Sequence, residues 1–107
     1  MKEEIIDQRD NILIRRAILE PGETSLWHTD VCHRFSVIVR GDELAINYRD
    51  GRPSKRFKVS PGDAGWDEPT DQIHRAVNVG RCTYEEFALF FLDSAGSEPQ
   101  PTIESVE

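Results

Sequence analysis

Three histidines, His28, His33 and His74, and one carboxylate, Asp30, are the side chains in this sequence best suited to binding a metal ion. His28 and Asp30 are two positions apart, so on a β-strand both side chains would leave the same face. Two imidazoles and a carboxylate can bind Fe(II), Mn(II), Zn(II) or Ni(II) and leave positions open for water or a substrate. The sequence therefore indicates one divalent metal site, which could polarise a substrate or activate water.

The elements that would position these side chains are short strands separated by turn residues. Strands are expected at residues 5–6, 12–19, 25–30, 35–39, 43–49, 55–59, 73–79 and 84–93, while residues 64–70 are expected to be short and irregular. In the stretch 43–49, Leu44, Ile46 and Tyr48 share one face, as in a strand with one side in a core. This pattern predicts an all-β fold, an antiparallel sandwich or barrel.

The last expected strand is apolar on both faces. Phe87, Leu89 and Phe91 alternate with Ala88, Phe90 and Leu92. Such a strand lies deep in a sandwich or at a subunit interface. A chain of 107 residues has little material to cover both faces, so we expect a homodimer.

Composition narrows the functional classes. The net charge of −7 gives no electrostatic reason to bind nucleic acid or an anionic membrane, and no stretch is apolar enough to span a bilayer. The acidic N-terminus does not resemble a signal peptide, and Cys32 and Cys82 form no CxxC motif, so we expect a cytoplasmic protein with reduced thiols. Residues 1–93 are expected to form one domain, and the acidic residues 94–107 a disordered tail.

Two motifs resemble those of the cupin superfamily, small jelly-roll barrels also called double-stranded β-helices. The matching positions are Gly22, His28 and Gly41 in the first motif and Gly62, Pro69, His74 and Asn78 in the second. The resemblance covers about residues 10–93. It implies a cupin barrel with one divalent metal held by His28 and His74. The run from His74 to Asp93 also resembles small single-domain cupins associated with β-alanine degradation.

The sequence departs from the cupin motifs at three positions. Asp30 stands where the second histidine of the HxH pair is expected, and Arg34 stands at the glutamate position, seven residues before Gly41. Asp71 replaces the glycine of the PxG element. The resemblance therefore retains His28 and His74 as ligands, with Asp30 substituting a carboxylate.

Arg34 and His33 compete for the inward position on the next strand. The cupin spacing places Arg34 inward, where a permanent cation would pair with Asp30 or bind a substrate carboxylate. Hydrophobic alternation in residues 35–39 instead places His33 inward, as an additional metal ligand. A bulge after Asp30 would decide between the two, and the sequence leaves both open.

In addition to Arg34, Trp66 and Asn78 are candidate ligand-binding residues. The basic pair at residues 15–16 fits a solvated strand face. His74 can also be read as a hydrogen-bonded core histidine. No nucleotide-binding or serine-hydrolase motif is present, and no catalytic residue is assigned.

Two functions remain open at this point. The first is a metal-dependent enzyme that acts on a small polar or carboxylate-bearing molecule. The second is a metal-free sensor or carrier of a small ligand, with Arg34 as the anion contact.

Overall fold

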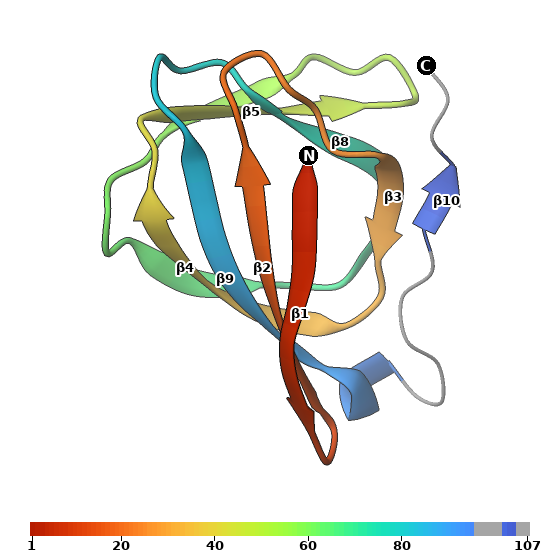
Figure 1. Ribbon diagram of the computed structural model, residues 1–107. Coiled ribbons are helices and arrows are strands. Elements are labelled where there is room, and N and C mark those ends of the chain that lie inside the picture. Colours follow the sequence, from red (N-terminus) through yellow and green to blue (C-terminus); the bar gives the residue numbers. More distant parts are fainter. Residues whose placement is uncertain (96–101, 105–107) are drawn as a thin grey trace.

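The computed structural model describes residues 1–95 and 102–104. Within these residues, ten strands form two five-stranded antiparallel sheets around a common interior (Figure 1). The predicted all-β barrel is therefore confirmed. Among the described residues, no helix has the length and apolar character needed to cross a membrane.

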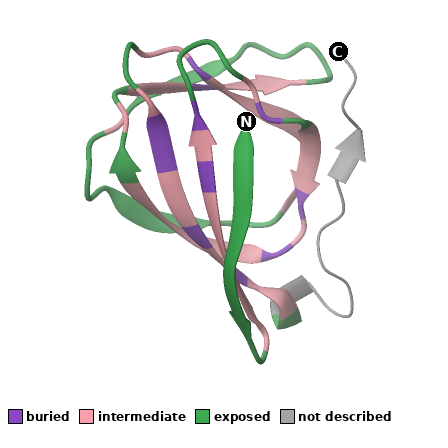
Figure 2. Ribbon diagram, in the orientation of Figure 1, coloured by how far each residue is buried: buried purple, intermediate pink, exposed green. Residues whose placement is uncertain are grey.

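The first sheet has its strands in the order β1, β2, β9, β4, β7. Their bounds are β1 (Lys2–Arg9), β2 (Ile12–Leu19), β9 (Tyr84–Phe91), β4 (His33–Arg40) and β7 (Ala64–Asp67). Figure 1 shows β1, β2 and β9 side by side. β1 is exposed along its whole length, whereas buried positions concentrate on β2 and β9 (Figure 2). β9 is thus the centre of this sheet in both position and burial.

The second sheet has the order β10, β3, β8, β5, β6. Its strands are β10 (Thr102–Glu104), β3 (Trp27–Asp30), β8 (Thr70–Asn78), β5 (Glu43–Tyr48) and β6 (Lys55–Lys58). A short 3-10 helix, Leu92–Ala95, follows β9. Most of the tail expected to be disordered, residues 94–107, lies outside the described residues, so that expectation stays a prediction.

One predicted element is wrong. Residues 64–67 are not irregular, because Ala64–Asp67 pairs along β4 from Arg34 to Val37. Four residues that include a glycine are too few to show an alternating pattern, and only the pairing with β4 defines them as a strand.

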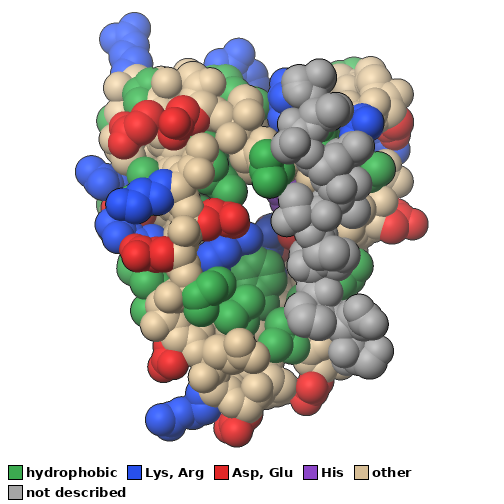
Figure 3. All heavy atoms as spheres, turned by 45° about the vertical axis from the view of Figure 1, so that its right-hand side comes forward, with side chains coloured by type: hydrophobic (Ala, Val, Ile, Leu, Met, Phe, Trp, Pro, Cys, Tyr) green, Lys and Arg blue, Asp and Glu red, His purple; other side chains and the backbone are tan. Residues whose placement is uncertain are grey.

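The barrel interior is a cavity of about 960 Å³. Leu44, Ile46 and Tyr48 line it, as their alternation predicted. The lining also includes Ile5 of β1 and His28 of β3, which belong to different sheets. On the side of the molecule that carries β3, Figure 3 shows a hollow near the middle, with charged and hydrophobic side chains along its coloured border.

Two motif glycines explain how the turns close the barrel. Gly41 has a φ of 149°, and a Cβ atom there would lie 2.9 Å from Tyr84 Cδ1. Gly62 has a φ of 92°, in the left-handed region that side chains disfavour. Glycine is therefore required at Gly41 by both conformation and space, and at Gly62 by conformation.

Candidate functional site

His28, Asp30 and His74 meet on the inner wall of the second sheet. His28 on β3 and His74 on β8 are direct partners in the antiparallel ladder, and their ring centroids are 4.5 Å apart. Asp30 follows His28 on the same strand, and one ligand atom from each of the three residues lies within 4.8 Å of the others. The predicted ligand set is therefore assembled by two neighbouring strands.

Backbone carbonyls orient both imidazoles. The Nδ1 atom of His28 lies 2.8 Å from the carbonyl oxygen of Leu26, and Nδ1 of His74 lies 2.8 Å from that of Gln72. A carbonyl oxygen only accepts hydrogen bonds, so each Nδ1 carries the proton. In the neutral rings both Nε2 atoms then present lone pairs, and both face Asp30.

The carboxylate of Asp30 completes a set of electron-pair donors. Its Oδ2 atom lies 3.0 Å from His74 Nε2 and 3.6 Å from His28 Nε2. This oxygen is buried and has no hydrogen-bond partner among the described residues. Three lone pairs that converge without a hydrogen between them repel one another, so the arrangement needs a cation, either a proton or a metal ion. The residues present therefore fit a divalent metal with two nitrogen ligands and one oxygen ligand.

The surroundings set the charges of these groups. Burial alone raises the pKa of the Asp30 carboxyl, but contacts with His28 and His74 and the charge of Arg34 outweigh burial and hold this pKa well below its usual range. Burial lowers the pKa of the His74 imidazole, but Asp30 and the Gln72 carbonyl outweigh that effect and raise it. Asp30 is thus an anion, and His74 and Arg34 are the two groups beside it that can offset its charge when no metal is bound.

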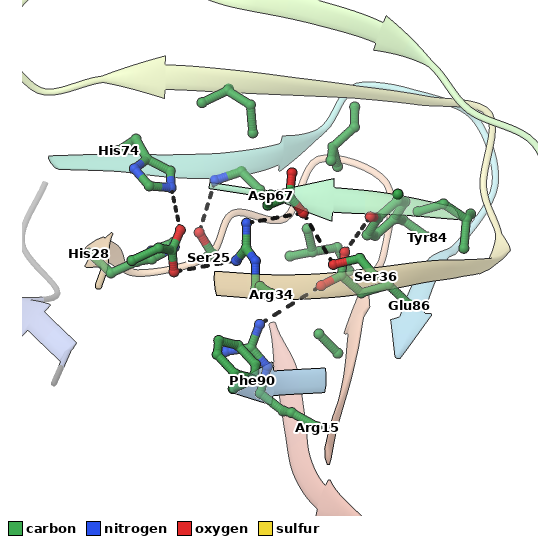
Figure 4. Close-up of a pocket in the computed structure, with 18 of the residues that line it drawn as sticks. Arg15, Ser25, His28, Arg34, Ser36, Asp67, His74, Tyr84, Glu86 and Phe90 are labelled. Atoms are coloured by element: carbon green, nitrogen blue, oxygen red, sulfur yellow. Dashed lines mark hydrogen bonds and ion pairs between the residues drawn. The ribbon is translucent and has the colours of Figure 1, made fainter. Parts of the chain in front are cut away.

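Arg34 points into the barrel, as the motif spacing predicted. Its Nη1 atom lies 3.3 Å from Asp30 Oδ1 and its Nη2 atom 3.5 Å from Asp67 Oδ2 (Figure 4). Asp67 also accepts a hydrogen bond from Ser36 Oγ at 3.3 Å. The Nε atom of Arg34 is buried and has no hydrogen-bond partner in the part of the chain that the structure describes. One cation is therefore shared by two carboxylates and retains a free donor inside the cavity.

His33 does not join this cluster. Its side chain is 42% exposed, and its Nδ1 atom lies 3.3 Å from Glu68 Oε1. The cluster found among the described residues contains His28, Asp30 and His74 only. Since Arg34 is inward, the strand alternation sends His33 to the opposite face, and it is not placed to act as a metal ligand.

Trp66 borders the cavity, whereas Asn78 is not among its lining residues. Trp66 is 60% exposed, and its ring lies against Phe35 and Phe91, which face away from the cavity. Asn78 is buried and donates hydrogen bonds to the carbonyl oxygens of Leu19 and Cys82, both at 2.9 Å. The structure gives Asn78 a role in holding turns together, in place of the expected ligand contact.

Arg15 and Asp67 line the cavity, although the sequence did not indicate either as a site residue. Arg15 does not lie on the solvated face predicted for the basic pair, because its guanidinium is 4.7 Å from the centre of the Phe90 ring, which also lines the cavity. Arg34 lies 5.8 Å from the same ring (Figure 4). The sequence did contain a signal for Arg15, which shares its strand face with the apolar residues Leu13, Ala17 and Leu19.

Comparison with solved structures identifies the architecture. No protein-family model and no curated protein sequence matches the chain. A cupin domain from Bordetella pertussis Tohama I superposes with a TM-score of 0.72 at 13% identity, over 83% of this chain and 90% of that one. A cupin-like protein from Thermotoga maritima MSB8 gives 0.70 at 18% identity, over 98% of this chain and 77% of that one. The chain has the cupin fold. The likeness to cupins associated with β-alanine degradation stays a prediction.

A more distant cupin neighbour is an enzyme. An oxalate oxidase in complex with the substrate analogue glycolate superposes with a TM-score of 0.58 at 20% identity. The match covers 77% of this chain but only 42% of the oxalate oxidase. At this identity the comparison shows the cupin fold alone.

Proposed function

We propose that this cupin binds one divalent metal ion through His28, Asp30 and His74 and processes a small polar or carboxylate-bearing molecule in its interior. The observation that carries the proposal is the buried Asp30 Oδ2 atom, which lacks a hydrogen-bond partner among the described residues and faces two imidazole nitrogens. A divalent ion that accepts both imidazole nitrogen and carboxylate oxygen, such as Fe(II), Mn(II), Zn(II) or Ni(II), suits these ligands.

A bound ion would supply Lewis-acid chemistry, polarising a substrate oxygen or activating water. The side chains and backbone of this protein would orient the metal ligands and the substrate. The carbonyls of Leu26 and Gln72 hold both imidazoles in the ligating tautomer. Arg34, whose buried Nε–H has no partner within residues 1–95 and 102–104, is placed to orient a substrate carboxylate. We assign no proton-transfer residue.

A second function is favoured by one specific contact. Arg34 already pairs with Asp30, at 3.3 Å, so it can neutralise that carboxylate without any metal. In this alternative the barrel is a metal-free sensor or carrier of a small anion, and Arg34 is the anion contact.

Metal content distinguishes the two functions. The protein would be incubated with iron, manganese, zinc or nickel, desalted, and measured by plasma mass spectrometry. We expect about one ion per chain in the wild type, loss of the ion in His28→Ala and His74→Ala, and retention in the matched control His33→Ala. Retention in either of the first two variants would reject the ligand pair. No ion in the wild type would leave the metal-free alternative.

Small carboxylates are the first ligands to test. Glycolate and oxalate are chosen from the structural neighbour, and β-alanine from the sequence resemblance. Binding by calorimetry should require the metal if the first function holds, and should persist in metal-free protein if the second holds.

The cytoplasmic location belongs to the same proposal. Cys32 and Cys82 are both free thiols. Burial, helped by the charge of Asp30, raises the pKa of the Cys32 thiol and makes it unreactive. This usage of cysteine is typical of a reducing compartment.

A further inference from the structure

Arg15 is a second cation on the cavity wall, apart from the candidate metal cluster. It projects inward from β2, as Arg34 does from β4. Strand β9 runs between these two strands, and its residue Phe90 contacts both arginines (Figure 4). The guanidinium carbon of Arg15 lies 4.7 Å from the centre of the Phe90 ring, and that of Arg34 lies 5.8 Å from it. The two guanidinium carbons are therefore no farther apart than the sum of these distances.

The protein contacts of Arg15 leave some of its hydrogen-bond donors unused. A guanidinium carries five N–H donors. The Nη1 atom of Arg15 lies 2.8 Å from Glu3 Oε2, but Nη2 is 3.8 Å from Glu86 Oε2, which is too far for a hydrogen bond. The Nε atom is buried and has no hydrogen-bond partner among the described residues. A buried donor without an acceptor is unfavourable, so an acceptor supplied by a ligand would stabilise this guanidinium.

The carboxylates that contact the two arginines can give way to a ligand. Glu3 lies on the exposed edge strand β1 and its side chain is 42% exposed, so it can turn to solvent. In the proposed metal site Asp30 binds the ion, which leaves Arg34 Nη1 available. Glu86 is held by another partner, because it accepts a hydrogen bond from the Tyr84 hydroxyl at 2.5 Å. A ligand carboxylate on each arginine would therefore take the place of a protein carboxylate and would face a cation.

The cavity has room for a short molecule that reaches both arginines. Ser36 and Gly65 line it in the row of paired residues that runs across the first sheet from Arg15. A Cβ atom added at Gly65 would meet no atom within 4 Å, so the wall is open at this point. The apolar side chains of Leu44 and Ile46 line the cavity from the other sheet, and such a surface suits methylene groups.

We infer that Arg15 and Arg34 bind the two ends of a short dicarboxylate, and that Arg15 selects for the second carboxylate. Guanidinium groups bind carboxylates through paired, charge-assisted hydrogen bonds. The inference rests on the proposed function, in which Arg34 is the contact for a ligand carboxylate. It narrows the carboxylate-bearing substrates to those that carry a second carboxylate at the far end of a short apolar chain.

Acids of matched chain length test this subsite. Succinate, glutarate and adipate would be compared by calorimetry with butyrate, valerate and hexanoate, which have the same chain lengths and a single carboxylate. We expect at least one dicarboxylate to bind the wild type about tenfold more tightly than its matched monocarboxylate. Arg15→Met should abolish this preference and leave the monocarboxylate affinity and the metal content unchanged.

The neighbouring residue provides a matched control. Arg16 follows Arg15 on β2 and contacts Glu4 of β1 at 2.7 Å, but it does not line the cavity. Arg16→Met should therefore keep the preference for dicarboxylates. Glu3→Gln removes the carboxylate that competes for Arg15, so it should tighten dicarboxylate binding several-fold and leave monocarboxylate binding unchanged. Glu4→Gln should change neither affinity, whereas a purely structural role of Arg15 would predict no tightening in Glu3→Gln.

Three results would overturn the inference. They are equal binding within every pair of acids, a preference that persists in Arg15→Met, and dicarboxylate binding that is no tighter in Glu3→Gln. Because Glu3 is on an exposed strand, the last result is obtained even if Arg15→Met does not fold. Metal content in the same samples separates this inference from the proposed metal site. A preference for dicarboxylates in protein that retains no metal would reject the metal-dependent function alone, and metal retention without the preference would reject the dicarboxylate alone.

Discussion

Arg34 Nη1 lies 3.3 Å from Asp30 Oδ1, so a permanent cation contacts the only carboxylate of the candidate metal cluster. A metal ion bound by the same carboxylate would be repelled by the guanidinium, which cannot lose its proton. The second contact of Arg34, with Asp67 at 3.5 Å, offsets part of that positive charge. The affinity of the site for metal therefore depends on how Arg34 is shared between the two carboxylates.

Replacing Arg34 should separate metal binding from anion binding. We expect Arg34→Met to bind Zn(II) or Mn(II) about tenfold more tightly, because a competing charge near the ion is removed. The same change should weaken binding of glycolate or oxalate. Competition with a chelator and calorimetry measure the two affinities.

The control for this change is Arg75→Met, which removes a cation that lies over Trp27 at 4.5 Å and leaves Asp30 and its contacts intact. Weaker metal binding in Arg34→Met would contradict the competition between the two cations.

Asp67 should support metal binding without touching the metal. In Asp67→Asn the guanidinium of Arg34 is left with Asp30 alone, and we expect metal affinity to fall several-fold. In an Arg34→Met background the same change should have no effect, because there is no cation left to share. A double-mutant cycle on the metal dissociation constant measures this coupling. Additive effects would show that Asp67 acts by another route.

Asn78 should matter for stability and not for ligands. Asn78→Ala leaves the carbonyls of Leu19 and Cys82 without their donor, and Gly80 N without the acceptor 2.9 Å away. We expect a loss of about 2–4 kcal/mol in the free energy of unfolding, measured with urea. Metal content per folded chain should not change. A selective loss of metal or ligand binding in Asn78→Ala would instead show that Asn78 contributes to the site.

The control for Asn78 is Asn47→Ala, which removes side-chain contacts with Ser54 and Arg75 nearer the surface. These contacts are more solvated, so the expected cost is under about 1 kcal/mol.

Glu85 should make the protein sensitive to acid. Hydrogen bonds from Arg16 outweigh the effect of burial and, with those from Arg40, lower the pKa of Glu85. A carboxyl with a lowered pKa stabilises the fold above its unfolded-state pKa of about 4.3, and this stabilisation is lost as the pH falls through the lower folded-state pKa. The free energy of unfolding should therefore decrease on acidification in this range.

Glu85→Gln should flatten that pH dependence and cost about 1–3 kcal/mol at pH 7. The control is Asp71→Asn, which removes an exposed carboxyl group. Unfolding curves between pH 2 and 7 make the comparison, and an unchanged slope in Glu85→Gln would refute the assignment.

Motif spacing predicted the parts of the site that backbone geometry fixes. Gly41 and Gly62 sit where positive φ values are needed, and His28 and His74 face each other across a ladder that the turns hold in register. These positions depend on local conformation, which the sequence records directly. Such features of the fold and of the candidate site could be read before the structure was known.

Hydrophobic alternation failed where both faces of a strand are apolar. On β4 it favoured Phe35, Val37 and Val39 as the inward side chains, whereas Arg34, Ser36 and Ile38 line the cavity. Alternation identifies a buried face only if the other face is polar, and both faces of β4 carry apolar side chains, Ile38 on one and Phe35 and Val37 on the other. The role of Asp67 was equally hidden, because its importance comes from the pairing of β7 with β4.

The donor side chains and the competing cation belong to different sheets. His28, Asp30 and His74 project from β3 and β8, and Arg34 and Asp67 from β4 and β7. The width of the barrel at this level therefore sets how strongly the positive charge of Arg34 acts on Asp30. A change that moves the two sheets apart, even a bulkier side chain elsewhere on β4, should weaken the contact between Arg34 and Asp30, as partial removal of Arg34 would. A change that brings the sheets closer should strengthen that contact.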